Sequence, residues 1–465
     1  MDTQSLRKSF FRENGILAWM VCIGMLLSNI IVQGINNCFG GVISTIIVEF
    51  QSNLASVSLI PSIHSAAYYF AGFICSILVR WYSFRTLLFI GGVGSTLAFI
   101  ASFYASSINS LILWYGLFGG MGNGLVYVPG LIACGFYFDE SKRALATGIA
   151  TSGSGIGIVA IPLFVNYVNE NFGWRHCMLF LCFISPIICL VALIMLPLAK
   201  PSNDEPQVAP EKPSILENGE KTKSDPQKLQ PAKQKRSSIC DMKFVGFDIW
   251  QVMGQFKQYL LHSWNLMRQP KLVTYCISHG LFTLAYFIPV NFLSAMMVES
   301  KEIGVDEAGF IIPIVGLATC AGKLLTGLLI SQFNLNALGL HTFYLVACGI
   351  CCLIFTFCSQ YSHFVAVAVF YGLAVGPIDM LIMECLSKMF GMELVKDTVG
   401  FVMLVYAIGA GIGAPIGGLI YDVTENFDGV FYFSAAIYTV GAIFALFSLI
   451  FSKKLEKIRS EYLPI

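Results

Sequence analysis

The stretch Gly155-Ile156-Gly157 leads through an apolar run into Val168-Asn169-Glu170-Asn171-Phe172, and the same order returns near the end of the chain. There it reads Gly411-Ile412-Gly413 and then Val423-Thr424-Glu425-Asn426-Phe427, and the two glycine triplets begin 256 residues apart. Each copy carries one proline, Pro162 or Pro415, and each is followed by a second apolar run. A period of this length predicts that the chain consists of two halves with the same architecture.

Apolar residues make up 56% of the chain and charged residues only 12%, whereas a soluble domain has roughly 25% charged residues. The mean hydropathy is +0.73, which is typical of a chain embedded in lipid. Twelve apolar runs are long enough to cross a hydrocarbon layer of about 30 Å. They cover residues 16–38, 57–79, 86–106, 110–136, 144–168, 175–197, 272–297, 308–332, 340–359, 364–390, 398–421 and 429–452. The sequence therefore predicts an all-α membrane protein with twelve transmembrane helices in two pseudo-symmetric halves of six.

A long polar gap separates the two predicted halves. From Lys200 to about Phe244 it has too few apolar residues to form a core, so we expect a disordered linker. Aromatic residues return up to Met267, which fits either an amphipathic helix at the inner membrane face or a simple extension of the seventh span. The predicted parts are a leader (1–15), an amino-terminal half (16–199), a linker (200–270), a carboxy-terminal half (271–452) and a tail (453–465).

Lys and Arg are unevenly distributed between the segments that join the predicted helices. With the amino terminus in the cytosol, 25 of the 28 Lys and Arg residues lie on the cytosolic side. Arg175 and Lys301 then lie outside, and Lys323 lies within a helix. The positive-inside rule therefore predicts that the leader, the linker and both termini are cytosolic.

The sequence lacks the signatures of several other functional classes. No basic stretch with interleaved aromatic residues indicates nucleic-acid binding, and no phosphate-binding loop, zinc-protease motif or nucleophile elbow indicates an enzyme. The fifteen cysteines lie mostly within predicted helices and lack C-x-x-C spacing, so we expect neither a metal site nor a disulfide framework. We also expect no cofactor. Functional residues are therefore best sought among polar side chains at membrane depth.

Lys323 is the most conspicuous of these polar residues. A charge at the centre of a transmembrane helix costs about 2.5–3.5 kcal/mol on insertion scales, so it needs a carboxylate, a bound anion or water. Lys323 and Asp379 each lie about sixteen residues into an inward-running helix, which puts them at one depth in the carboxy-terminal half. We hypothesise that they face each other or a common cavity. In the alternative, Lys323 reaches the cytosolic interface through its long stem, and Asp379 only caps a kink after Gly376-Pro377.

The first predicted helix carries a stripe of amide side chains. Asn29, Gln33, Asn36 and Asn37 are spaced i, i+4, i+7 and i+8, which places them on one helical face. The opposite face is almost entirely apolar. The stripe is predicted to contact a substrate in a central cavity, or else to hold neighbouring helices together.

Some further polar residues are weaker candidates. Tyr68 in the second helix and His279 in the seventh are candidates for substrate binding or coupling, although a histidine within a helix is more often a packing residue. His64 and Tyr69 belong to the same group. Glu384 is expected to pair with Lys388, which lies one helical turn later.

One segment resembles a known family. It runs through Tyr137-Phe138, Lys142-Arg143-Ala144-Leu145-Ala146-Thr147-Gly148-Ile149-Ala150 and Ser152-Gly153-Ser154-Gly155. This segment is similar to the helix 4–5 signature of the monocarboxylate-transporter family, solute carriers of the major facilitator superfamily. The resemblance continues through Leu284-Ala285-Tyr286-Phe287 and Pro415-Ile416-Gly417-Gly418 and covers essentially all twelve helices. It implies the major facilitator fold, whose halves rock around a central site, and it marks Lys142, Arg143, Gly148 and Gly153 as signature residues.

The chain departs from that family at positions that matter for coupling. Proton-coupled members resemble one another in a helix 1 lysine and a helix 8 Asp/Arg pair, and the corresponding positions are Asn37, Thr319 and Lys323. The loss of two of these three charges argues against obligatory proton coupling. The loop between helices 2 and 3, where the superfamily expects an Asp-Arg gating pair, reads Arg80-Trp81 and continues to Arg85.

The resemblance implies transport of a small organic solute, in the first place a monocarboxylate. Lys323 would then contact the anion, and Asp379 would be its counter-charge in the empty site. A carrier of an aromatic amino acid or of a zwitterion such as creatine or carnitine, without proton coupling, fits equally well, and a non-transporting sensor or scaffold is a third alternative. The family also implies the plasma membrane, protons as an optional partner and, by analogy with some members, a single-span accessory glycoprotein.

Overall fold

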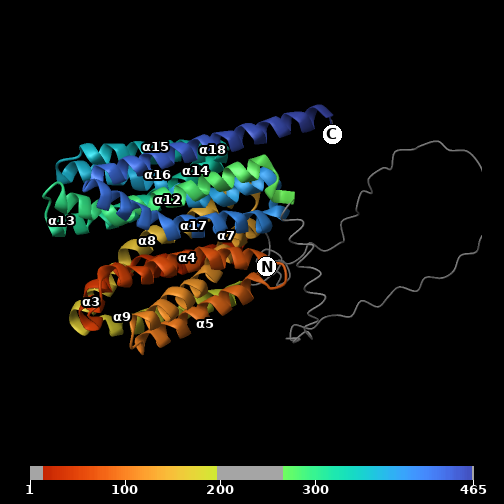
Figure 1. Cartoon of the computed structure of the whole chain (residues 1–465). Coiled ribbons are helices and arrows are strands. Elements are labelled where there is room, and N and C mark those ends of the chain that lie inside the picture. The colour runs from red at the N-terminus through yellow and green to blue at the C-terminus, as the bar shows by residue number, and fades with distance from the viewer. Residues whose placement is uncertain (1–13, 196–264, 463–465) are drawn as a thin grey trace, which may run out of the picture. The chain divides into compact units, whose positions relative to one another are not determined.

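The computed structural model describes residues 14–195 and 265–462, and every regular element in these two ranges is a helix (Figure 1). Twelve helical segments are long and apolar enough to cross a membrane. This confirms the predicted all-α fold with twelve transmembrane helices. The predicted leader, apart from its last two residues, and most of the predicted linker, with its amphipathic helix, lie outside the described residues.

The amino-terminal half contains the first six spans. They are α2 (Ile16–Asn37), α4 (Leu54–Leu78), α5 (Phe84–Phe103), the continuous run of α6 (Ile108–Leu111), η2 (Ile112–Gly119) and α7 (Gly120–Tyr137), then α8 (Glu140–Phe172), and the pair α9 (Trp174–Ile184) and α10 (Pro186–Ile194). Two short elements, η1 (Phe39–Val42) and α3 (Ile43–Phe50), connect α2 to α4.

The carboxy-terminal half repeats this order of six spans. They are α12 (Pro270–Glu299), the pair α13 (Val305–Gly309) and α14 (Ile311–Phe333), α15 (Ala337–Phe357), α16 (Tyr361–Phe390), α17 (Met392–Thr424) and α18 (Phe427–Tyr462).

The starts of several spans are fixed by local hydrogen bonds. The side chains of Asn53, Ser83, Asp139 and Asn336 each accept a hydrogen bond from a backbone N–H three residues later. Such N-caps satisfy donors that the first helical turn leaves unpaired. Gly391 has a φ of +79°, which a residue with a side chain rarely adopts, and it lets the chain turn from α16 directly into α17.

The two copies of the repeated tract lie mainly in two helices that pack across the interface between the halves. The first copy belongs to α8, which packs against α14, and the second to α17, which packs against α4 (Figure 1). Small residues permit the α8–α14 approach. A Cβ atom on Gly148 would lie 2.8 Å from the carbonyl oxygen of Lys323, and one on Gly327 would lie 2.9 Å from that of Ala144. The other signature glycine, Gly153, faces Leu26 of α2 within its own half.

Candidate functional site

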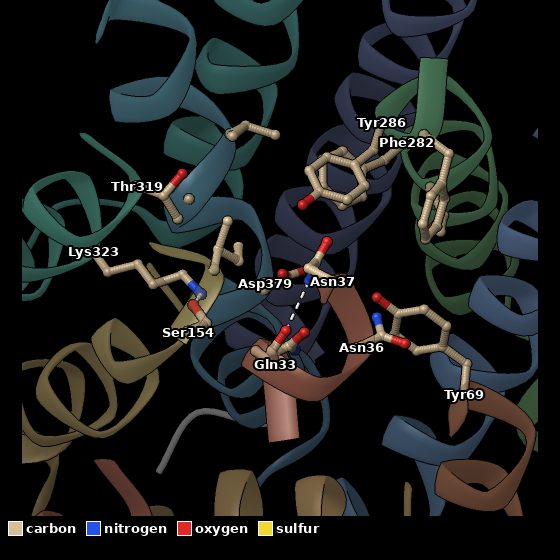
Figure 2. Close-up of a pocket in the computed structure, with 15 residues that line it drawn as sticks. Gln33, Asn36, Asn37, Tyr69, Ser154, Phe282, Tyr286, Thr319, Lys323 and Asp379 are labelled. Carbon is tan, nitrogen blue, oxygen red and sulfur yellow. Dashed lines mark hydrogen bonds between the residues drawn. The ribbon is translucent and has the colours of Figure 1, made fainter. Parts of the chain in front are cut away.

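A polar cavity lies between the two halves. The volume within it that the centre of a water molecule can occupy is about 30 Å³, so in this state the cavity is narrow and has room for only about two water molecules. Figure 2 shows its polar members pointing toward one another from both halves. It is lined by Gln33, Asn36, Asn37, Tyr69, Ser154 and Ile158 from the amino-terminal half, and by Phe282, Thr283, Tyr286, Phe287, Thr319, Lys323, Val375, Gly376 and Asp379 from the other.

Lys323 extends from α14 into this cavity and is only 3% exposed. Its ammonium group donates hydrogen bonds to Ser154 Oγ at 2.7 Å and to the backbone oxygen of Thr151 at 3.3 Å, and both acceptors belong to α8 in the opposite half. The side chain therefore points across the interface between the halves instead of reaching the end of its helix.

Asp379 lies on the same cavity and is half-buried on α16. Its Oδ1 accepts a hydrogen bond of 2.9 Å from the hydroxyl of Tyr406 on α17. Within the part of the chain that the structure describes, Asp379 and Lys323 form no direct ion pair. The cavity thus holds two opposite charges, each bonded to a neutral partner, so a ligand could contact both.

Three of the four amides of the first span line the cavity. Gln33 Nε2 donates to the hydroxyl of Tyr68 at 3.2 Å, Asn37 Nδ2 donates to the backbone oxygen of Gln33 at 2.8 Å, and Asn36 Oδ1 accepts from Ser65. Figure 2 shows these amides across from Lys323. Their remaining donor and acceptor positions are available to a bound solute.

Asn29 differs from the expectation for the stripe, because it does not line the cavity. Its Nδ2 donates to the backbone oxygens of Met25 and Ala150, each at 3.0 Å, so it joins α2 to α8.

We predict that Asn29→Ala lowers the free energy of unfolding by about 0.6–1.7 kcal/mol, the range measured for polar contacts between membrane helices. The apparent melting temperature of the purified protein should fall while KM for the transported solute stays unchanged; a raised KM would contradict this assignment.

Of the two neighbouring tyrosines proposed from the sequence, one lines the cavity and the other does not. Tyr69 lines the cavity, and its ring meets that of Tyr406 from the opposite half edge-on at 5.2 Å. Tyr68 is buried behind the cavity and reaches it only through Gln33. Because adjacent helical residues point about 100° apart, sequence spacing alone could not choose between the two.

His279 does not line the cavity but lies directly behind it. Its Nδ1 is 2.9 Å from the hydroxyl of Tyr406, the same group that bonds Asp379. Its ring stacks on that of His341, on α15, with centroids 4.5 Å apart and planes 19° apart. A buried polar chain therefore leads from the cavity into the carboxy-terminal half.

Ion pairs join the halves at the inner end, the end at which α2 begins. Arg143 of α8 donates from Nε and Nη2 to the two carboxylate oxygens of Glu384 on α16, at 3.0 and 3.1 Å. Arg80, after α4, pairs with Asp397 of α17 at 2.5 Å. Both pairs connect opposite halves, and the Arg143–Glu384 pair is almost fully buried.

The expected pairing of Glu384 with Lys388 is wrong. Lys388 Nζ contacts Asn334 Oδ1 at 3.4 Å on the exposed surface, whereas Glu384 is buried against Arg143. A bidentate arginine contact in a dry interface is stronger than an exposed pair along one helix. Two other candidates from the sequence, Lys142 and Arg85, are exposed and lie away from the cavity.

In the described part of the chain, the ion pair and the carboxylate hydrogen bonds found at the outer end stay within one half. Glu49 of α3 accepts hydrogen bonds from Trp174 Nε1 and Arg175 Nη1, all in the amino-terminal half. Burial works to raise the pKa of the Glu49 carboxyl, but these hydrogen bonds and the Arg175 charge hold that pKa below its ordinary value. In the other half, Tyr421 donates to Glu299 at 3.0 Å. Among the described residues, the ion pairs that join the halves, Arg143–Glu384 and Arg80–Asp397, thus lie at the inner end.

The site has the groups for reversible binding of a small solute. Its donors are an ammonium group, amides and hydroxyls, and the rings of Phe282 and Tyr286 form an apolar wall. Among the described residues, no group of three or more His, Cys, Asp or Glu side chains is placed to hold a metal ion.

Comparisons with known proteins agree with this arrangement. The sequence model of the Major Facilitator Superfamily matches residues 25–394 and, in a second match, 275–461. A solved Major Facilitator Superfamily transporter, FucP in the outward conformation, has a TM-score of 0.60 at 16% identity, with 91% of this chain and 97% of that chain covered. At this identity the likeness shows the shared fold alone.

Curated relatives are similar over most of the chain. Monocarboxylate transporter 6 of Mus musculus is 24% identical, covering 94% of this chain and 88% of the relative. Monocarboxylate transporter 12 of Xenopus laevis is 26% identical, covering 93% and 88%, and monocarboxylate transporter 3 of Gallus gallus is 25% identical, covering 93% and 78%.

Proposed function

Because the chain belongs to the Major Facilitator Superfamily and is similar to monocarboxylate transporters over most of its length, we propose that it is a divergent monocarboxylate carrier, which transports a small organic monocarboxylate by alternating access around the cavity. The observation that carries the proposal is the ammonium group of Lys323, which is buried between the halves and whose hydrogen bonds within the described ranges go to neutral oxygens. A buried cation that forms no direct ion pair among the described residues favours an anion site, in which the solute would supply the adjacent negative charge.

The lining side chains suit a carboxylate with a short organic tail. The carboxylate would accept from Lys323, with the hydroxyls of Ser154 and Thr319 close by. The tail would lie against Phe282 and Tyr286, while the amides of α2 bind polar substituents. Residues from both halves contribute to the cavity, so relative movement of the halves would change its contacts with the solute.

The distribution of ion pairs supports a state that is closed at the inner end. Arg143–Glu384 and Arg80–Asp397 join the halves there, whereas the outer contacts stay within each half. With cytosolic termini, as the positive-inside rule predicts, the solute would enter this state from outside the cell. We place the protein in the plasma membrane on the same grounds of family and orientation.

A zwitterion is the second candidate solute, and Asp379 favours it. Because Asp379 and Lys323 line one cavity without pairing in the described structure, an amino acid or a betaine could bind each charge separately. The sensor or scaffold alternative predicts no transport at all.

Uptake into proteoliposomes tests these alternatives. The purified full chain is reconstituted, and a labelled panel of monocarboxylates, aromatic amino acids, creatine and carnitine is assayed against protein-free vesicles. Saturable uptake of a monocarboxylate supports the proposal, whereas uptake of zwitterions alone would replace it with the second candidate. Absence of saturable uptake for the whole panel would favour the scaffold.

A further inference from the structure

The inner ends of the two halves differ in charge once the two ion pairs that join the halves are set aside. Among the remaining described residues, the inner end of the amino-terminal half has two basic and two acidic side chains, which are Arg85, Lys142, Asp139 and Glu140. The inner end of the carboxy-terminal half has six basic side chains and one acidic side chain, which are Arg268, Lys271, Lys388, Lys396, Lys453, Lys454 and Glu393. The excess of positive charge in the described structure therefore belongs to one half.

Four of these basic residues lie where α12 begins and α18 leaves the membrane. Ser448 Oγ of α18 donates a hydrogen bond of 2.8 Å to the backbone oxygen of Lys271, so these two residues lie at the same level. The two helices run antiparallel, so the exposed Arg268 before α12 lies near the level of Lys453 and Lys454 on α18. These four residues, Arg268, Lys271, Lys453 and Lys454, form the α12–α18 basic cluster.

The cluster combines a fixed cation with exposed ones. Lys271 Nζ donates to the backbone oxygen of Met389 at 2.6 Å and lies 4.1 Å from the centre of the Phe390 ring. Lys453 and Lys454 are exposed, and neither forms an ion pair with a described residue. Two ammonium groups of the cluster are therefore available to an anion from outside the protein.

An apolar surface of α18 lies next to these lysines on the side of the membrane. Phe447, Ile450 and Phe451 are exposed large apolar side chains within the last span. At that depth they contact lipid tails. Cationic groups beside such a surface match the two parts of a phospholipid, an anionic headgroup and apolar tails.

We propose that the α12–α18 basic cluster binds the headgroup of an anionic phospholipid, with one acyl chain against Phe447, Ile450 and Phe451. With cytosolic termini, as the positive-inside rule predicts, the cluster faces the inner leaflet, which carries the anionic lipids. Basic residues at the cytosolic end of a transmembrane helix are typical of such recognition. The headgroup would bind one half only, and the site does not depend on which solute the central cavity carries.

Competition binding to the purified full chain in a neutral detergent tests this site. The probe is phosphatidylserine with a fluorophore on an acyl chain, and its fluorescence anisotropy rises on binding. Unlabelled phosphatidylserine should displace the probe at a concentration at least about tenfold lower than phosphatidylcholine, because each basic residue near the headgroup contributes about fivefold in affinity. Added salt should weaken this preference, because ions screen exposed charges.

Variants should locate the preference on α18. The double variant Lys453→Gln, Lys454→Gln should lose at least about fivefold of the preference for phosphatidylserine. Arg85→Gln with Lys142→Gln removes as many charges from the inner end of the amino-terminal half and should keep the preference. Lys453→Arg with Lys454→Arg retains the charges and should also keep it. Apparent melting temperatures show whether each variant is folded.

Soluble competitors distinguish a lipid from a free anion. Glycerophosphoserine has the same headgroup without tails, so it cannot use the apolar surface of α18 and should displace the probe only weakly. Displacement by glycerophosphoserine or inorganic phosphate as effective as that by phosphatidylserine would make the cluster a site for soluble anions and refute the lipid proposal. Equal competition by phosphatidylserine and phosphatidylcholine in the wild type refutes it as well, even if no variant folds. An unchanged preference in the folded Lys453→Gln, Lys454→Gln protein is a third refuting result.

Discussion

Lys323→Gln is expected to lower uptake of the transported monocarboxylate by about 10- to 150-fold. A hydrogen bond to a charged group contributes about 1.5–3 kcal/mol, and each 1.4 kcal/mol is a factor of about ten. Glutamine can still donate to Ser154, but it brings no positive charge to the carboxylate. The variant also leaves Asp379 as the only charge among the cavity-lining residues, which disfavours an anion further.

Initial rates of uptake over a range of solute concentrations check this prediction. Lys388→Gln is the matched control, because Lys388 is an exposed lysine of the same half that contacts Asn334. Lys323→Arg should retain part of the uptake activity, because it keeps the positive charge but replaces the compact ammonium with a planar guanidinium group. Uptake by Lys323→Gln at the wild-type rate would remove Lys323 from the binding site.

The fold was predictable because the bilayer leaves few choices. Backbone groups in lipid must be satisfied internally, so each apolar run of sufficient length becomes a helix. The twelve spans follow, although α8 and α17 are longer than the predicted runs. Their polar first turns, which begin at Glu140 and Met392, do not look like membrane segments in the sequence.

The site was predictable only where a residue is conspicuous. Lys323 and Asp379 stand out as charges in apolar helices, and both line the cavity. Ser154 lies in the segment that resembles the family signature and Tyr406 is a common core residue, but nothing in the sequence indicates that their hydroxyls bond these charges. Their roles depend on contacts between helices that hydropathy does not report.

The ion pairs between the halves were missed for a related reason. Local spacing favoured Lys388 as the partner of Glu384, but the true partner, Arg143, lies 241 residues away in the sequence. One signal was available: Arg143 and Glu384 are both predicted near the inner ends of their helices. Arg143 belongs to the family signature, and Glu384 is a carboxylate predicted at the same membrane depth. Together they indicate a possible ion pair between the halves.

Glu384→Gln is expected to open the inner end of the protein. Removing one partner of a buried ion pair costs about 3–5 kcal/mol, because the other charge remains buried without compensation. The pair exists only while the inner ends of α8 and α16 touch, so the cost falls on the closed state alone. A shift of even 1.4 kcal/mol changes the ratio of closed to open molecules about tenfold.

An added cysteine at Met383 reports this opening. Met383 belongs to α16, and its side chain is fully buried against Gly135 of α7, where the two halves meet. In inside-out vesicles, a membrane-impermeant thiol reagent should label Met383→Cys at least about tenfold faster when Glu384→Gln is also present. The same proteins without the added cysteine supply the background from native thiols.

Two further variants determine whether the buried pair itself is responsible for this effect. Glu299→Gln, which removes a carboxylate bonded to Tyr421 at the outer end, should leave the labelling rate unchanged. The charge-swapped protein, Arg143→Glu with Glu384→Arg, should return labelling toward the slow wild-type rate, because the pair is restored in the opposite sense. If Met383→Cys is labelled as slowly with Glu384→Gln as without it, the Arg143–Glu384 pair does not hold the inner end closed. The Arg80–Asp397 pair would then be the next candidate for that role.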